Sequence, residues 1–154
     1  MGAYDNCIIL IPALQPDERL TQMIHGLHER GFHKIAVMDD GSSDDRQKYF
    51  QEVEIMGVKV IHHSKKMGKG VALRLADEKI GESDFYITAD CDGQYSPEDI
   101  EKVAKELLNN PDCFVLGVRT YERKKGKKVR FWLNSCQKLF FRITNHGKEC
   151  PDPR

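Results

Sequence analysis

The sequence predicts an α/β fold in which a mostly parallel sheet carries helices on both faces. Short apolar runs alternate with segments whose apolar residues recur every three or four positions, and glycine or proline separates them. No linker, repeat or low-complexity segment interrupts this alternation. Hydrophobic residues make up 40% and charged residues 31% of the 154 residues, as in one globular domain with a core. Repeated strand–helix alternation is typical of a parallel sheet.

The apolar runs are predicted to be strands, at residues 7–10, 35–38, 58–61, 85–89 and 113–118. Pro12 closes the first strand. The first helix opens at residues 16–18, where proline suits the first turn and acids face the positive end of the helix dipole. Gly31 ends it. Helical spacing predicts that its buried face consists of Leu20, Met23, Ile24 and Leu27.

Further helices are predicted between the later strands. One runs through Tyr49, Phe50 and Val53 and ends at Gly57, and another follows residues 68–70. Residues 96–99 read Ser-Pro-Glu-Asp, which has the form of a capping box with proline at the first helical position. The buried face of that last helix is predicted to contain Ile100, Val103, Ala104 and Leu107.

Charge is balanced over the whole sequence, with 24 basic and 24 acidic residues, so no net field attracts nucleic acid. Residues 119–130 are locally basic, with seven Lys or Arg against one acid, Glu122. Such a loop is either a solvated surface or a guide for a phosphate. An aromatic, amphipathic segment follows at residues 131–143.

Cysteine usage and hydropathy favour a cytoplasmic protein. The five cysteines are odd in number and form no C-x-x-C pair, which favours buried thiols over a disulfide frame or a zinc site. The first residues lack the pattern of a signal peptide. No apolar stretch approaches the length of a membrane span.

Acidic residues follow two of the predicted strands directly. Asp90 and Asp92 come after the run 85–89, and Asp39 and Asp40 come after the run 35–38. Loops that follow parallel strands emerge at one edge of the sheet, so the four acids are expected side by side there. A D-x-D pair alone is most often a solvated turn. Two acid pairs at one edge, however, favour a nucleotide and a hard divalent cation between them.

Two common nucleotide-binding motifs are absent from the sequence. The first strand is followed by Pro-Ala-Leu-Gln-Pro and not by G-x-G-x-x-G, so a dinucleotide fold is not predicted. The sequence also lacks G-x-x-x-x-G-K-[ST]. The Gly-Lys-Gly at residues 68–70 is either a plain helix entry or a phosphate contact.

These motifs, taken in order, resemble family-2 glycosyltransferases. The matching segments are residues 9–14, 39–43, 68–70, 88–94 and 116–119. The similarity is greatest to the branch of dolichol-phosphate mannose synthases and bacterial polyprenyl-phosphate glycosyltransferases. It extends from Cys7 to the last residue.

The resemblance implies a GT-A fold, a nucleotide-diphosphate sugar donor and Mg²⁺ or Mn²⁺. It implies that Asp90 and Asp92 hold the metal and that Asp92 and Asp152 are catalytic. The remaining donor-binding residues implied by the family are Pro12, Ala13, Asp39, Asp40, Lys69 and Arg119.

The resemblance also implies a single catalytic domain over residues 1–154 that lacks the usual C-terminal extension. The expected acceptor is a polyprenyl phosphate or another glycan acceptor. Peripheral contact with the inner face of the membrane and self-association are open alternatives. A nucleotide-sugar-binding remnant with little turnover and a sugar nucleotidyltransferase are the competing functions. The sugar nucleotidyltransferase is disfavoured because no glycine-rich, arginine-bearing loop follows the first strand.

Overall fold

The computed structural model describes residues 2–71, 73, 80 and 83–117. The protein divides into two compact units, Met1–Lys105 and Glu106–Arg154. No helix in the described residues is long and apolar enough to cross a membrane. The elements are β1 (Cys7–Ala13), α1 (Glu18–Glu29), β2 (Ile35–Asp39), η1 (Asp44–Arg46), α2 (Gln47–Ile55), β3 (Lys59–His62), β4 (Phe85–Thr88) and α4 (Pro97–Asn109).

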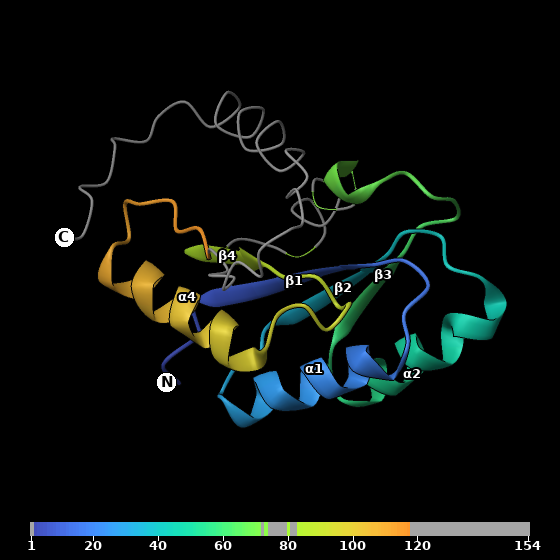
Figure 1. Ribbon diagram of the computed structural model, residues 1–154, viewed down its shortest axis with the longest axis horizontal. Coiled ribbons are helices and arrows are strands. Elements are labelled where there is room, and N and C mark those ends of the chain that lie inside the picture. Colours follow the sequence, from blue (N-terminus) through green and yellow to red (C-terminus); the bar gives the residue numbers. More distant parts are fainter. Residues whose placement is uncertain (1, 72, 74–79, 81–82, 118–154) are drawn as a thin grey trace, which may run out of the picture. The chain divides into compact units, whose positions relative to one another are not determined.

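The four strands form one parallel sheet in the order β3-β2-β1-β4 (Figure 1). The polypeptide moves outward from β1 to β2 and β3, and then returns to place β4 on the other side of β1. The direction of winding therefore reverses between β1 and β4. In open parallel sheets, ligands bind outside the carboxyl ends of the strands at such a point.

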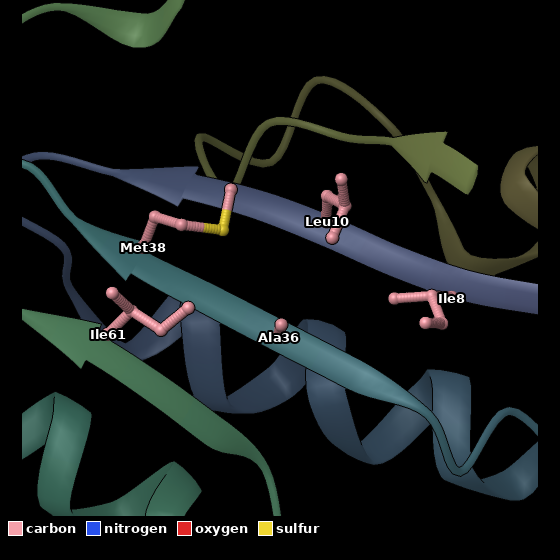
Figure 2. Packing of buried hydrophobic residues seen from close by; sticks show 5 residues of the cluster. All are labelled: Ile8, Leu10, Ala36, Met38 and Ile61. Carbon is pink, nitrogen blue, oxygen red and sulfur yellow. The ribbon is translucent and has the colours of Figure 1, made fainter. Parts of the chain in front are cut away.

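Side chains alternate between the two faces of the sheet, and each face has its own core. Figure 2 shows one face, where Ile8, Leu10, Ala36, Met38 and Ile61 form a buried cluster turned away from α1. Leu73 and Ile80 pack against that cluster. The helices α1 and α2 cover the other face (Figure 1), and the predicted α/β fold is confirmed.

The helical periodicity of the sequence predicts the buried faces of the helices well. The buried residues of α1 are the four predicted ones, and α2 buries Phe50 and Val53. The capping box is confirmed, since the Asp99 amide donates to Ser96 Oγ and the Ser96 amide donates to the Asp99 carboxylate. In α4, Ile100 and Ala104 are buried as predicted, whereas the predicted Val103 and Leu107 are only half-buried.

Strand β1 is three residues longer than predicted and contains Pro12. Its pairing with β2 continues to Ala13, whereas its pairing with β4 stops at Leu10. A proline is tolerated in a sheet where its nitrogen has no ladder partner to meet. The early end of β4 therefore allows β1 to continue through Pro12 toward the switch point.

The predicted strand at residues 113–118 is wrong over the described residues 113–117, which have no regular structure. The Cys113 amide donates to Asn110 O in a turn directly after α4, and Phe114 and Leu116 are exposed. The expectation of free thiols is also wrong at Cys113, which is disulfide-bonded, whereas Cys7 and Cys91 are free. The spacing of cysteines in a sequence does not report pairs that form only through the fold.

Replacing Gly26 by alanine is expected to destabilise the protein by about 1–2 kcal/mol. A Cβ at this position would lie 2.5 Å from Cγ of Pro97, so α1 and the start of α4 must move apart. The higher helix propensity of alanine offsets part of this cost. The measurement is denaturant unfolding, with Gly70→Ala as the control because that helical glycine has nothing within 4 Å. Equal stabilities of the two variants would contradict the expected contact.

Candidate functional site

The carboxyl end of β1 contacts the acidic segments on both of its sides. The Asp40 amide donates to Ala13 O at 2.9 Å, which ties the loop after β2 to this end of β1. On the other side, Cys91 Sγ lies 4.0 Å from Pro12 O. Because all strands are parallel, the sequence-predicted residues Pro12, Ala13, Asp39 and Asp90 lie at one edge of the sheet.

Asp39 is buried at the end of β2, and its two carboxylate oxygens are occupied by hydrogen bonds. The Ser42 amide donates to Oδ1 at 2.8 Å, and Gln47 Nε2 donates to Oδ2 at 3.2 Å. His62 Nδ1 lies 2.9 Å from the same Oδ2. Burial raises the pKa of Asp39, but the hydrogen bonds from His62, Ser42 and Gln47 outweigh it and leave the pKa lowered. Asp39 therefore holds His62, whose side chain is 45% exposed, at the sheet edge.

Asp40 is also buried and holds the loop that follows β3. Its carboxylate accepts the amides of Met67 at 2.7 Å and Gly68 at 2.9 Å. This brings the segment with Lys69 to the sheet edge. Both ring nitrogens of His63 are buried without a hydrogen-bond partner among the described residues, and Nδ1 lies 3.9 Å from Asp40 Oδ1. A bound ligand or an ordered water commonly satisfies such a group.

Asp90 follows β4 and forms an ion pair with Lys69. Lys69 Nζ lies 2.5 Å from Asp90 Oδ1, and both side chains are partly exposed. The pair joins the loop after β3 to the loop after β4, across the carboxyl end of the sheet. A phosphate bound at this point would accept hydrogen bonds from the Lys69 ammonium group, which the Asp90 carboxylate holds in position.

Asp92 lies in a tight loop stabilised by neighbouring side chains. Its Oδ1 accepts the Gln94 amide at 3.0 Å, and its Oδ2 accepts Gln94 Nε2. Its backbone oxygen accepts Arg19 Nη1 at 2.5 Å. Arg19 also donates to Asp17, and these hydrogen bonds lower the pKa of the Asp17 carboxyl to about 2.

The loops after β1 and β2 are joined by a pair of hydrogen bonds that the sequence does not predict. Ser42 Oγ accepts the Gln15 amide at 2.9 Å, and Ser43 Oγ donates to Gln15 Oε1 at 2.7 Å. Gln15 has a φ of 53°, a left-handed conformation that is uncommon outside glycine. The strained residue is held by both serines, and it fixes the rim beside Ala13 and Asp40.

The described residues thus bring together most of the sequence-predicted donor residues. Arg119 and Asp152 lie outside the described residues. The sequence does not predict His62, Arg19 and Gln15 as functional. In the sequence, His62 is marked only by its place directly after the third apolar run. Gln15 and Arg19 are marked only by their places shortly after β1.

A divalent ion at this edge of the sheet would have two carboxylates available, those of Asp90 and Asp92. The described residues contain no group of three or more His, Cys, Asp or Glu side chains arranged to hold a metal. Mg²⁺ typically takes only one or two carboxylates together with substrate phosphates and water, which is the set that Asp90 and Asp92 offer. Burial raises the pKa of the intervening Cys91 thiol to about 11, so this thiol is neutral near pH 7.

The variant Asp39→Asn is expected to lose stability less steeply in acid than the parent. A carboxyl whose folded pKa is lowered stabilises the fold above its unfolded pKa of about 3.9, and this contribution disappears as the pH falls through the lower folded value. Asparagine keeps the shape, and His62 and Gln47 can present acceptors to it by a change of tautomer and an amide flip. The measurement is the urea midpoint between pH 7 and pH 2, with the exposed Asp44→Asn as control. Parallel curves for parent and Asp39→Asn would contradict it.

Known proteins resemble this protein in sequence. A UDP-N-acetylglucosamine–dolichyl-phosphate N-acetylglucosaminyltransferase of Methanococcus voltae is 28% identical over an aligned length of 137 residues, and the match covers 79% of the present sequence and 55% of that protein. Glycosyltransferase AglJ of Haloferax volcanii is 29% identical over 130 residues, which are 84% of the present sequence and 41% of that protein. The sequence spans about half the length of the curated relatives it matches.

A solved structure is similar in fold to this protein, and a protein family matches most of its sequence. The crystal structure of S. aureus TarS 1–349 has a TM-score of 0.54 at 19% identity, covering 68% of the present protein and 32% of TarS 1–349. This similarity supports the predicted GT-A fold. Residues 8–151 match the family described as "Glycosyl transferase family 2". The match covers most of the sequence and confirms the resemblance to family-2 glycosyltransferases that the sequence motifs indicate. The protein therefore belongs to glycosyl transferase family 2.

Proposed function

We propose that this protein provides the donor site of a glycosyltransferase that moves a sugar from a nucleotide diphosphate to a polyprenyl phosphate, with inversion. The observation that carries the proposal is the meeting of Asp39, Asp40, Lys69 and Asp90 at one sheet edge beside the switch point. The Methanococcus voltae relative is named for a UDP-sugar and dolichyl phosphate, which supports both substrate classes.

In this proposal, each strand end serves one part of the donor. Pro12 and Ala13 line the nucleotide pocket, and Asp39 with His62 attached to it faces the base or ribose. Asp40 holds the loop from which Lys69 reaches the diphosphate. A bound Mg²⁺ or Mn²⁺ on the D-x-D acids would offset the charge that grows on the leaving diphosphate.

The proposed acceptor brings its own nucleophile. A phosphate monoester has a second pKa of about 6, so it is largely dianionic at neutral pH and needs no strong base. Cationic side chains are then sufficient to guide it, and Arg119 with the basic residues 119–130 is proposed for this role. A hydroxyl acceptor would instead need a general base, for which Asp152 is proposed. Since polyprenyl phosphates reside in membranes, the proposal includes peripheral membrane contact.

The proposal is tested first by binding and then by transfer. UDP, GDP and their sugars should raise the unfolding temperature more with Mn²⁺ than without it. A ligand at 100 times its dissociation constant adds about 2.7 kcal/mol of stability. A protein that no nucleotide stabilises would contradict the proposed donor site. Stabilisation without transfer to polyprenyl phosphate or polyprenol would favour the alternative of a binding remnant.

A further inference from the structure

Arg19 connects the loop of Asp92 to the start of α1. Its Nη1 donates to the backbone oxygen of Asp92, and its Nε and Nη2 donate to the Asp17 carboxylate at 2.7 to 3.0 Å. Asp17 is itself the N-cap of α1, since its carboxylate accepts the Arg19 amide. The planar guanidinium is therefore fixed on one side by a helix terminus, and its other side fixes the loop.

The Arg19 side chain packs closely against the loop at Gly93. Gly93 has a φ of 77°, and a Cβ added there would lie 3.1 Å from Cδ of Arg19. The stem of Arg19 therefore occupies the space that a side chain at this position would need. An open hollow of about 150 Å³ lies beside this contact. Its lining is Arg19, Gln22, Met23, Gly93, Tyr95 and Pro97.

The contact concerns the site more than the stability of the fold. The Arg19 side chain is 52% exposed, and exposed ion pairs contribute little to folding. Arg19, however, donates to the backbone oxygen of Asp92, and the proposed function assigns the carboxylate of this same residue to the metal. Loss of a group that orients a metal ligand typically lowers metal affinity by about 10- to 100-fold.

We infer that Arg19 is a positioning residue that holds the Asp92 carboxylate in place for the metal and diphosphate, an inference that rests on the proposed function. The guanidinium sets the path of the backbone at residues 92–93, and Gln94 then orients the carboxylate through its amide and side chain. Arg19 itself does not touch the reacting atoms in this assignment.

The test measures Mn²⁺ affinity in the presence of UDP or GDP by calorimetry, together with the unfolding temperature without ligand. Arg19→Ala is expected to weaken Mn²⁺ binding on the order of tenfold, as is common when a group orienting a ligand is lost. Its unfolding temperature should remain near that of the parent. Arg19→Lys should recover part of the affinity, because an ammonium can still donate to the Asp92 oxygen but cannot bridge Asp17 in the same way.

Arg30→Ala is the matched control at the opposite end of α1. Arg30 forms ion pairs with Glu98 and Glu101 and is only 28% exposed, so its loss should lower the unfolding temperature and leave Mn²⁺ affinity unchanged. If the parent binds Mn²⁺ with nucleotide and Arg19→Ala binds it equally well, the positioning role is overturned. If the parent binds nucleotide equally well with and without Mn²⁺, the positioning role is overturned while the donor site stands, and if the parent binds no nucleotide at all, the proposed function fails.

Discussion

Replacing Gly41 by alanine is expected to cost roughly 2–5 kcal/mol of the free energy of unfolding. Gly41 has a φ of 80°, where a residue with a Cβ pays about 1–2 kcal/mol. The added Cβ would also lie 2.6 Å from the carbonyl carbon of Lys65 and 2.6 Å from the amide nitrogen of Lys66. Backbone atoms cannot move aside as a flexible side chain can, so the loop after β3 must shift. Urea unfolding of the parent and the variant measures the loss.

Gly57→Ala separates the two causes of this loss. Gly57 has a φ of 87° but nothing within 4 Å of the added Cβ, so this variant pays only the left-handed backbone cost of about 1–2 kcal/mol. The difference between the two variants measures the close approach of Gly41 to residues 65–66. Equal losses would show that the loop after β3 adapts freely.

The Gly41→Ala substitution is also expected to weaken nucleotide binding beyond its effect on stability. Asp40 holds the amides of Met67 and Gly68, and this loop continues directly to Lys69. A shift at residues 65–66 would move Lys69 away from Asp90. Gly57→Ala, which lies at the opposite end of β3, should leave nucleotide affinity unchanged.

Local features of the fold could be predicted because short-range patterns determine them. The spacing of Leu20, Met23, Ile24 and Leu27 places these residues on one face of a helix whatever lies beyond it. The capping box at Ser96 and Asp99 depends only on residues three apart. Acids directly after β-strands reach one sheet edge because parallel topology requires it, so the grouping of Asp39 and Asp90 could be expected before the strand order was known.

Features that depend on a distant partner could not be predicted. Pro12 continues β1 because β4 ends early, which no local pattern reports. The resemblance implies an Asp39 that binds the donor, yet its oxygens are taken by Ser42, Gln47 and His62, from up to 23 residues away. Arg19 reaches Asp92 over 73 residues. Such contacts follow from tertiary packing, and their residues carry no motif of their own.

The variants Asp90→Asn and Asp92→Asn are expected to lower the rate of sugar transfer in the proposed reaction by about 10²–10³. Asparagine keeps the shape of each side chain but removes the negative charge that attracts a divalent ion, and loss of one preorganised electrostatic group commonly has this magnitude. Both residues are partly exposed, so the fold should be retained. The two variants should still differ. Asp90→Asn releases Lys69 from its ion pair and leaves it available to the diphosphate, so its nucleotide affinity without metal should be the higher of the two.

Rates with UDP- and GDP-sugars and a polyprenyl phosphate, measured over a range of Mn²⁺ concentrations, test this expectation. The parent rate should rise with Mn²⁺, and the rates of both variants should be nearly independent of it. Asp84→Asn is the matched control, because this exposed acid lies at the opposite end of β4 and far from the carboxyl edge of the sheet. It should behave as the parent. Because the ion is expected to bridge protein and diphosphate, an Asp92→Asn variant with the Mn²⁺ dependence of the parent would show that other residues hold the ion.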